Sequence, residues 1–600
     1  MSIEPTPMKQ PPRQLLTKSH CDPDDVALKS FFLGPQSENA DWLEEILRSV
    51  LTAYFSWRRR THAGDGQAIS RADQNHPAFR RRRREFIAAT QRLLSRFEGE
   101  VPKFSPRYIA HMFSETSMPA IVGHVITLLH NPNNISGESS RVGVAIESEA
   151  IRELASMLGI DETTARGHFT SGGTVANFEA MVRARRRMER WLTVGARARN
   201  TGDLRWSLFE AAHMGWSDHD ELLEALDIDS SALESLSTNP FEVAAQLGSI
   251  FEAAYRGPVI LVPDHKHYSW VKGAELLGLG REAFWSVQLD ERGVLCVDDL
   301  RRRIDEARDK NRPIMMVVSV AGTTELGAFD PVDEVQFLLD RLQRQQNVHI
   351  YHHVDAAYGG FFAASACRDD RSCELDDGVC RALAAIRRTN SVTLDPHKLG
   401  YVPYASGAFI STDSREYFAS SVDAPYIAFD SDRDRGPQTI EGSRSAAGAV
   451  ATWLTARTIG LDTAGYGRIL RRTVRARKRL QKTLKKINAP VRIAPTSSNI
   501  LTFCVARDGE SLSATNERTQ MLYETFSPER DGAFFVSRTS LRFSDYGPML
   551  QPFVSSWNGD TDADELTLIR LCIMNPFIDS RETETDFIAE FCLAVQQACS

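Results

Sequence analysis

The segment Ser391-Val-Thr-Leu-Asp-Pro-His-Lys-Leu-Gly400 predicts a buried strand that ends close to a lysine. Pro396 has no N–H and favours an extended geometry for Asp395 before it. Lys398 is therefore expected just past the end of the strand. A partly desolvated amine in such a place can lose its proton near neutral pH and attack a carbonyl carbon. The alternative is an ordinary lysine in a surface turn. The other motifs of the chain distinguish a reactive lysine from a surface one.

The composition is that of a globular protein with more than one domain. The chain has 600 residues, of which 42% are hydrophobic and 25% are charged, and its net charge is −8. This length exceeds a single ordinary core, and the mildly acidic balance argues against general nucleic-acid binding. The nine cysteines follow no disulfide or zinc pattern, and no signal peptide or membrane-spanning run is visible. We therefore expect a cytoplasmic protein that binds neither membrane nor nucleic acid.

Strand-like and helical runs alternate from residue 258 onward, which predicts an α/β fold with a mostly parallel sheet. The β-rich runs are 259–263, 314–321, 348–354, 392–394 and 408–410. The expected divisions are a mobile arm at 1–25, a helical and loop segment at 26–135, a large α/β domain at 136–440 with a helical insertion at 196–256, and a small α+β domain at 441–600.

Polar side chains follow four successive strands of this predicted sheet. His267 comes after the first, Thr323 and Thr324 after the second, Asp355 after the third and Lys398 after the fourth. Ligands of such sheets bind beyond the carboxyl ends of the strands. We therefore expect these side chains to share one site.

A glycine-containing turn precedes the sheet region in the sequence. The segment Thr170-Ser-Gly-Gly-Thr-Val-Ala-Asn177 leads into a helical run over 178–191. Free backbone N–H groups at a helix start favour an anion such as phosphate. An ordinary capped turn is the alternative, since serine and threonine are common helix caps.

Pyridoxal phosphate is a ligand whose needs match this set. It needs a lysine for its aldehyde, a carboxylate beside its pyridine nitrogen, a flat group over its ring and donors for its phosphate. Lys398, Asp355, His267 and the turn Ser171–Thr174 match these needs. Taken singly, each has a simpler explanation, such as a helix cap for Asp355. Taken together at matching strand ends, they favour the cofactor.

The reaction also needs an acid, and two tyrosines are candidates. Tyr404 follows Lys398 closely, and Tyr426 lies on the charged loop 420–439, which we expect to act as a mobile lid.

The order and spacing of these motifs resemble the group II pyridoxal-phosphate-dependent decarboxylases, which have the fold type I, aspartate aminotransferase-like architecture. Within them the chain is most similar to the bacterial tyrosine decarboxylases. The resemblance implies a mostly parallel seven-stranded sheet and a smaller α+β C-terminal domain. The motifs that carry it are 170–177, 267–269, 321–324, 353–359, 395–398 and 441–445, with 104–108, 111–112, 131–134 and 398–407 for the closer similarity.

The resemblance also implies roles for individual residues. Lys398 would bind the cofactor aldehyde covalently, Asp355 would pair with the pyridine N–H, and His267 would stack on the ring and take part in catalysis. Tyr404 or Tyr426 would protonate the product. The remaining cofactor contacts would come from Ser171, Gly173, Thr174, Thr323, Ala357 and His397, and from Ser443 acting across the subunit interface of a homodimer.

The implied reaction converts an L-amino acid to its amine and CO2, with L-tyrosine as the expected substrate. An acidic or aliphatic amino acid is an alternative, and Arg107 could bind an acidic side chain. A metal-dependent hydrolase using His265, His267, His353 and His397 is a rival from another class, but no metal-like spacing supports it. The insertion and Val175, where the family more often has glutamate, leave the substrate open.

Overall fold

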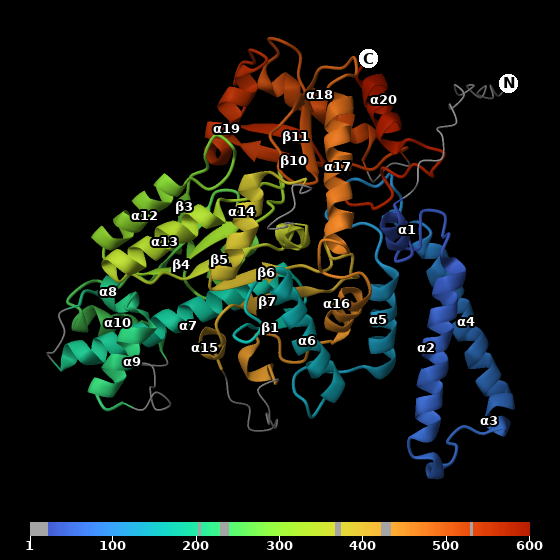
Figure 1. Cartoon of the computed structure of the whole chain (residues 1–600), viewed down its shortest axis with the longest axis horizontal. Helices are drawn as coiled ribbons and strands as arrows, with labels where there is room; N and C mark the ends of the chain where they lie inside the picture. Colours follow the sequence, from blue (N-terminus) through green and yellow to red (C-terminus); the bar gives the residue numbers. More distant parts are fainter. Residues whose placement is uncertain (1–21, 202–205, 229–238, 366–373, 422–433, 528–531) are drawn as a thin grey trace.

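The computed structural model in Figure 1 describes residues 22–201, 206–228, 239–365, 374–421, 434–527 and 532–600. Its centre is a seven-stranded sheet in the order β1-β7-β6-β5-β4-β2-β3. β7 runs antiparallel to both of its neighbours, and the pairs among β2 to β6 are parallel. This confirms the mostly parallel seven-stranded sheet. Its strands are β1 (Arg166–Thr170), β2 (Val259–Pro263), β3 (Phe284–Val287), β4 (Ile314–Val320), β5 (His352–Asp355), β6 (Ser391–Leu394) and β7 (Gly407–Ser411).

Helices cover both faces of this sheet. Alternate side chains along β2 pack against different helices, one set on each face. Ile260 and Val262 pack in a core with residues of α7 (Gly173–Asn200), whereas Val259 and Leu261 pack with α12 (Val297–Asp309) and α13 (Val332–Gln346). Successive strand residues point to opposite faces, so a strand buried on both sides is apolar throughout. The other helices of this part are α8 (Leu208–Ala212), α9 (Gly215–Ala225), α10 (Pro240–Ile250), α11 (Ser269–Leu276), α14 (Asp377–Ala385) and α15 (Ser414–Phe418).

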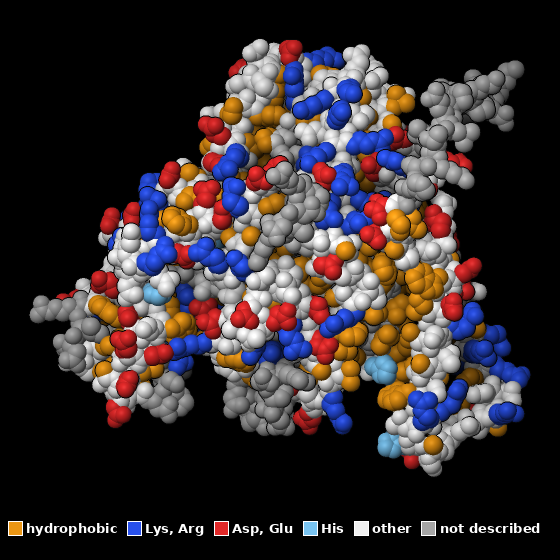
Figure 2. All heavy atoms as spheres, in the orientation of Figure 1, with side chains coloured by type: hydrophobic (Ala, Val, Ile, Leu, Met, Phe, Trp, Pro, Cys, Tyr) orange, Lys and Arg blue, Asp and Glu red, His pale blue; other side chains and the backbone are white. Residues whose placement is uncertain are grey.

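The N-terminal part is helical, and one pair of its helices stands away from the body (Figure 1). α2 (Ala40–Arg60) and α4 (Pro77–Phe97) contain no buried residue. The run Arg80–Arg84 lies in the first turns of α4, where Figure 2 shows basic side chains gathered at this end of the molecule. The boundary expected at residue 25 falls inside α1. The remaining helices here are α1 (Pro23–Lys29), α3 (Arg71–Asn75), α5 (Met118–His130) and α6 (Arg141–Met157).

The C-terminal part is a smaller α+β unit built on a four-stranded antiparallel sheet in the order β10-β11-β9-β8. α16 (Ala447–Thr458) precedes it and packs against α5 and α6. Among the described residues, no helix combines the length and apolar character needed to cross a bilayer. The other elements are α17 (Tyr466–Leu484), β8 (Val491–Ile493), β9 (Ile500–Val505), α18 (Leu512–Thr525), β10 (Ser537–Arg542), α19 (Phe543–Ser555), β11 (Glu565–Cys572) and α20 (Phe587–Cys599).

Candidate active site

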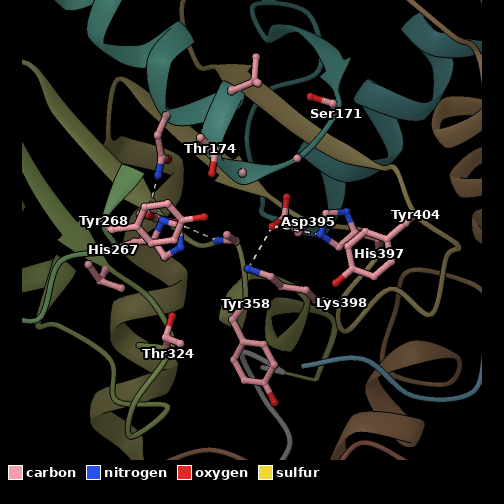
Figure 3. A pocket seen from close by; sticks show the side chains of 18 of the residues that line it. Ser171, Thr174, His267, Tyr268, Thr324, Tyr358, Asp395, His397, Lys398 and Tyr404 are labelled. Atoms are coloured by element: carbon pink, nitrogen blue, oxygen red, sulfur yellow. Dashed lines mark hydrogen bonds and ion pairs between the residues drawn. The ribbon is translucent and has the colours of Figure 1, made fainter. Parts of the chain in front are cut away.

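A cavity of about 320 Å³ opens beyond the carboxyl ends of β2, β4, β5 and β6 (Figure 3). The polar residues expected at these strand ends meet there, because parallel strands bring their carboxyl ends to one edge of the sheet. The cavity is lined by Ser171, Gly172, Gly173, Thr174, Val175, Asn177, His265, His267, Tyr268, Val320, Gly322, Thr324, Asp355, Ala357, Tyr358, Asp395, His397, Lys398 and Tyr404.

Lys398 projects into this cavity next to Asp395. Its Nζ lies 3.0 Å from Asp395 Oδ2, and its backbone N–H donates to the Asp395 carbonyl at 2.9 Å. Burial by itself would lower the pKa of Lys398, but the carboxylates of Asp395 and Asp355 outweigh it and raise that pKa. Asp395 is buried, and its Oδ1 has no hydrogen-bond partner among the described residues. The ion pair therefore joins a partly exposed lysine to a buried carboxylate, one oxygen of which is unpaired among the described residues.

Asp355 ends β5 and is fixed from three directions. Asn177 Nδ2 donates to its Oδ2 at 2.8 Å, Trp270 Nε1 donates to the same oxygen at 3.3 Å, and the Ala357 N–H donates to Oδ1 at 3.3 Å. Asn177 is itself held, since Thr393 Oγ1 donates to its amide oxygen at 2.8 Å. A carboxylate fixed in this way presents a negative charge of defined position to the cavity.

His267 lies at the wall formed after β2, beside Tyr268 (Figure 3). The Ser269 N–H donates to His267 Nδ1 at 3.3 Å, so the ring proton is assigned to Nε2. Burial lowers the pKa of His267, which favours the neutral ring. The Tyr268 ring lies 4.2 Å from the imidazole and is 59% exposed at the mouth of the cavity.

The glycine turn of the sequence opens α7 and lines the same cavity. A Cβ added at Gly173 would lie 2.9 Å from Asp395 Oδ2 and 3.1 Å from Ala357 Cβ. A side chain at this position would therefore fill the open space between the turn and these two residues, here called the cradle. The Ser171 N–H donates to Glu441 Oε2 at 3.1 Å, which shows that this turn accepts a negatively charged group.

His397 and Tyr404 form the opposite wall. Their rings stack with centroids 4.1 Å apart, and the Ser406 N–H donates to His397 Nδ1 at 3.2 Å. Burial raises the pKa of the Tyr404 hydroxyl, so this group keeps its proton at neutral pH, although the side chain as a whole is 58% exposed. A protonated phenol near Lys398 is positioned to donate a proton.

The residues present fit pyridoxal phosphate. An amine, a fixed carboxylate, a flat imidazole and a helix start with an open cradle line one cavity. Each of these groups matches one chemical part of the cofactor, namely its aldehyde, pyridine nitrogen, ring face and phosphate.

Two of the expected site residues, Thr323 and Ser443, do not line the cavity. Thr323 is 1% exposed and its Oγ1 accepts from the Ala328 N–H at 3.0 Å, while Thr324 lines the wall instead. Ser443 is exposed and accepts from Asn133 Nδ2 at 3.1 Å. Tyr426 lies outside the described residues, as does most of the loop 420–439.

Several cavity residues had no role in the sequence prediction. Asn177 lies four residues after Gly173, hence one helical turn along the same face of α7, and that spacing was a usable signal. The contact of Asp395 with Lys398 was readable in the same way, because the two are three residues apart. Tyr268 and Tyr358 also follow strands, β2 and β5, but neither of them was assigned a role from the sequence.

The residues behind the rival interpretations have other partners. His265 pairs with Asp330 at 2.8 Å and His353 with Ser391 Oγ at 2.8 Å. Within the part of the chain that the structure describes, no three His, Cys, Asp or Glu side chains are arranged to bind a metal ion. Arg107 contacts both carboxylate oxygens of Glu590, at 2.8 and 3.2 Å, and does not line the cavity.

Comparisons with known proteins indicate the same cofactor. The model of the pyridoxal-dependent decarboxylase conserved domain matches residues 248–501, and the model of the tyrosine decarboxylase C-terminal region matches residues 474–599. The chain is 29% identical to the L-tyrosine decarboxylase of Levilactobacillus brevis over 97% of each chain. It is 27% identical to the L-tyrosine decarboxylase of Enterococcus faecium over 96% of this chain and 98% of the relative.

Solved structures share the fold at lower identity. The Oryza sativa TDC structure with PLP and tryptamine superposes with a TM-score of 0.61 at 16% identity, covering 97% of this chain and 99% of that one. Mouse CSAD superposes with a TM-score of 0.58 at 20% identity, covering 83% and 85%. The fold is therefore the expected fold type I architecture.

Proposed function

The chain belongs to the pyridoxal-dependent decarboxylases, and we propose that it converts L-tyrosine to its amine and CO2 with the residues of the cavity described above. The observation that carries the proposal is the meeting of Lys398, Asp355 and His267 around one cavity. When bound, pyridoxal phosphate supplies an electron sink for the bond to the departing carboxylate. The following assignments say what the residues of this chain contribute.

Lys398 binds the cofactor aldehyde and Asp355 sets the charge of its ring. The Lys398 amine has to lose a proton before it can attack, and Asp395 at 3.0 Å is the nearest carboxylate to influence that proton. Asp355, held by Asn177 and Trp270, keeps a proton on the pyridine nitrogen. A cationic ring accepts electrons more readily, so Asp355 favours decarboxylation.

His267, the glycine turn and neighbouring residues hold the cofactor. The neutral His267 ring would cover one face of the cofactor, and the backbone of Gly173 and Thr174 with Ser171 and His397 would hold its phosphate. Ala357 lies beside Gly173 in the same wall. Thr323 and Ser443 stay part of the proposal. Thr323 would act through its loop, which carries Thr324. Ser443 would contribute to the site of the partner subunit.

Tyr404 is the proposed proton donor among the described residues, since its hydroxyl keeps its proton and its ring stacks beside the cavity. Tyr426 is the second candidate. Two observations favour L-tyrosine over an acidic substrate. The full-length relatives are L-tyrosine decarboxylases, and Arg107, the candidate for binding an acidic side chain, is paired with Glu590.

A homodimer is part of the proposal. The helices α2 and α4 expose large apolar side chains, among them Phe55, Trp57, Phe86 and Phe97, with exposed fractions of 46% to 74%. Several large exposed apolar side chains on one pair of helices favour a protein interface there. In this homodimer Ser443, which is exposed, would contribute to the site of the partner subunit. The domain divisions given above and a cytoplasmic location are kept as part of the same proposal.

An absorption spectrum of the purified protein with added pyridoxal phosphate tests the proposal. We expect a visible band that borohydride removes, with the label on the peptide that contains Lys398. A Lys398→Ala variant should lose the band. L-tyrosine should then release CO2, and L-glutamate and L-aspartate should not. A protein without a band and without label on Lys398 refutes the cofactor assignment, and CO2 from an acidic amino acid alone refutes the substrate.

A further inference from the structure

The glycine turn before α7 is already engaged by a negative charge of this chain. The Ser171 N–H donates to Glu441 Oε2 at 3.1 Å. Ser171 lines the cavity on this turn (Figure 3), and the proposed function assigns the same turn to the phosphate of the cofactor. One N–H donor therefore has two possible anionic acceptors, the carboxylate of Glu441 and the phosphate.

The backbone that carries Glu441 is anchored independently of this contact. The Ile440 N–H donates to Glu179 Oε1 at 2.8 Å, and Arg183 Nη2 donates to the Gln438 carbonyl at 2.8 Å. Glu179 and Arg183 lie on α7, are fully buried or nearly so, and pair with each other at 2.6 Å. The helix that begins at the glycine turn thus also holds the segment 438–441, which keeps Glu441 within reach of the turn.

The side chain of Glu441, by contrast, is held weakly. Among the described residues its carboxylate makes the hydrogen bond with the Ser171 N–H and no ion pair. Glu441 is half-buried and its neighbour Gly442 is exposed, so the side chain has a path to water. The net gain from a hydrogen bond at such a place is modest, because water replaces the lost partner. A fixed backbone and a displaceable side chain therefore occur at the same residue.

A phosphate at this turn excludes the carboxylate. Two anions that accept from one N–H lie close enough to repel each other, and the repulsion is stronger in a partly desolvated site than in water. In the empty site the carboxylate satisfies the donor and complements the positive end of α7. In the occupied site the phosphate does both.

We propose that Glu441 occupies the phosphate donor of the empty site and is displaced when the cofactor binds. The inference rests on the proposed function, which places the phosphate at this turn. Cofactor binding is then an exchange of one anion for another at the Ser171 N–H. Glu441 thereby lowers the affinity for ligands that carry a phosphate and leaves the affinity for ligands without one unchanged.

Two substitutions of Glu441 and one control test this exchange. Glu441→Gln keeps the size of the side chain and an acceptor oxygen but removes the charge, and Glu441→Ala removes the contact altogether. Glu138→Gln is the control. Glu138 is exposed, and the N–H of its neighbour Gly137 donates to Asp434, so the control removes the same charge near the same segment without touching the turn.

Each full-length apoprotein is titrated with pyridoxal phosphate, with pyridoxal and with inorganic phosphate. The visible band reports the first two ligands and calorimetry the third. In both Glu441 variants the Kd of pyridoxal phosphate and the Kd of inorganic phosphate should fall about fivefold to tenfold, since a charge-assisted hydrogen bond no longer has to be broken. The Kd of pyridoxal should stay within about twofold, as should all three constants in Glu138→Gln.

Other outcomes overturn the inference. Unchanged Kd values for both phosphate-bearing ligands show that Glu441 does not compete, and higher values show that it helps to hold the cofactor. Equal gains for pyridoxal phosphate and pyridoxal show that Glu441 acts on the cavity and not on the phosphate. If Glu441→Ala does not fold, Glu441→Gln decides alone.

Failure of the proposed function is a separate result. A wild-type protein whose Lys398 is not labelled after borohydride refutes the cofactor assignment. The titration with inorganic phosphate needs neither Lys398 nor an aldehyde, so tighter phosphate binding in the Glu441 variants would still support the exchange at the turn. A labelled Lys398 together with unchanged phosphate affinity overturns the inference and leaves the proposed function intact.

Discussion

Asp395 and Lys398 form an ion pair inside the cavity, with Lys398 Nζ 3.0 Å from Asp395 Oδ2. The Lys398 side chain is 20% exposed and the Asp395 side chain 3%. The carboxylate lies against Gly173, where an added Cβ would meet its Oδ2 at 2.9 Å. One carboxylate thus contacts both the amine that binds the aldehyde and the turn that receives the phosphate, which couples the two ends of the cofactor site.

Asp395→Asn should make the Lys398 amine available at lower pH. Asp395 is the strongest influence that raises the pKa of Lys398, while burial lowers it. Without the carboxylate the pKa of Lys398 falls, so more free amine exists at neutral pH. The measurement is the rate at which the visible band appears after apoprotein is mixed with pyridoxal phosphate, followed against pH. The pH at which this rate is half-maximal should be lower in Asp395→Asn than in the wild type by about one unit or more. Asp305→Asn, on the exposed surface of α12, is the control. An unchanged or higher midpoint contradicts the assignment.

Gly173→Ala should weaken cofactor binding. The new methyl group would lie 2.9 Å from Asp395 Oδ2 and 3.1 Å from Ala357 Cβ, in the space proposed for the phosphate. Loss of one charge-assisted contact corresponds to a dissociation constant about tenfold higher or more. Gly378→Ala is a matched control, because Gly378 also lies in the first turn of a helix and its added Cβ would meet only Arg381 Nη2 at 3.9 Å. Equal affinities of the two variants, measured by fluorescence titration, would place the phosphate elsewhere.

The elements that could be predicted from the sequence are those whose own residues are apolar enough to indicate burial. β2 is apolar throughout and β4 is apolar except for Ser319, and the runs expected at 259–263 and 314–321 match them to within one residue. β1, by contrast, reads Arg-Gly-His-Phe-Thr and is an edge strand whose burial comes from packing with β7 and α6. A pattern of alternating or continuous apolar residues is absent there, so local sequence does not reveal the strand.

The same distinction applies to the site. Asp355 is the last residue of β5, and His267 and Lys398 lie four residues after β2 and β6, so the parallel sheet brings them together without further information. Thr323 also follows a strand, yet its hydroxyl turns back to the Ala328 N–H and closes the loop. Asp330, by contrast, contacts His265 Nε2 from 65 residues away in the sequence. Contacts of that range depend on the folded chain and leave no spacing to recognise.

Tyr404→Phe should lower kcat and leave KM nearly unchanged. The ring would still stack on His397, whose centroid lies 4.1 Å away, but no proton could be given. General acid catalysis contributes about 10² to 10⁴ in rate, so a loss within that range is expected. Tyr268→Phe is the control, since Tyr268 also lines the cavity but pairs with Lys272 through its ring, at 4.6 Å. A fully active Tyr404→Phe enzyme would transfer the role of acid to Tyr426.

Leu94→Glu combined with Phe97→Glu should convert the protein to a monomer. Both side chains are 63% exposed near the end of α4, and charges there cannot be buried against a second copy. Sedimentation should show half the mass, and the monomer should bind pyridoxal phosphate more weakly because Ser443 of the partner subunit is missing. Leu593→Glu changes a leucine on α20 that is 51% exposed and should leave both properties intact. A monomeric wild type, or a double variant that stays dimeric, contradicts the proposed interface.

Glu115→Gln should remove a pH dependence of stability that originates far from the chemistry. Glu115 is 5% exposed, its Oε1 accepts from the Gly34 N–H at 2.8 Å, and its Oε2 has no partner among the described residues. Burial raises the pKa of Glu115 to about 7, from 4.5 in the unfolded chain. Between these two values the folded state binds the proton that the unfolded state has lost. The free energy of unfolding therefore falls as pH rises from 4.5 to 7 and is lowest above 7. The total loss is about 3 kcal/mol, because each unit of pKa difference corresponds to about 1.36 kcal/mol.

The measurement for this residue is the Tm between pH 5 and pH 8, compared for the wild type, Glu115→Gln and the exposed control Glu162→Gln. The wild type and the control should lose Tm as pH rises, whereas the Glu115→Gln profile should be flatter and should lie above that of the wild type at pH 8. Because Glu115 binds the Gly34 N–H between α1 and α2, its ionisation loosens the attachment of the N-terminal helices. Profiles of wild type and Glu115→Gln that run parallel would show that this carboxyl titrates alike in the folded and unfolded chain.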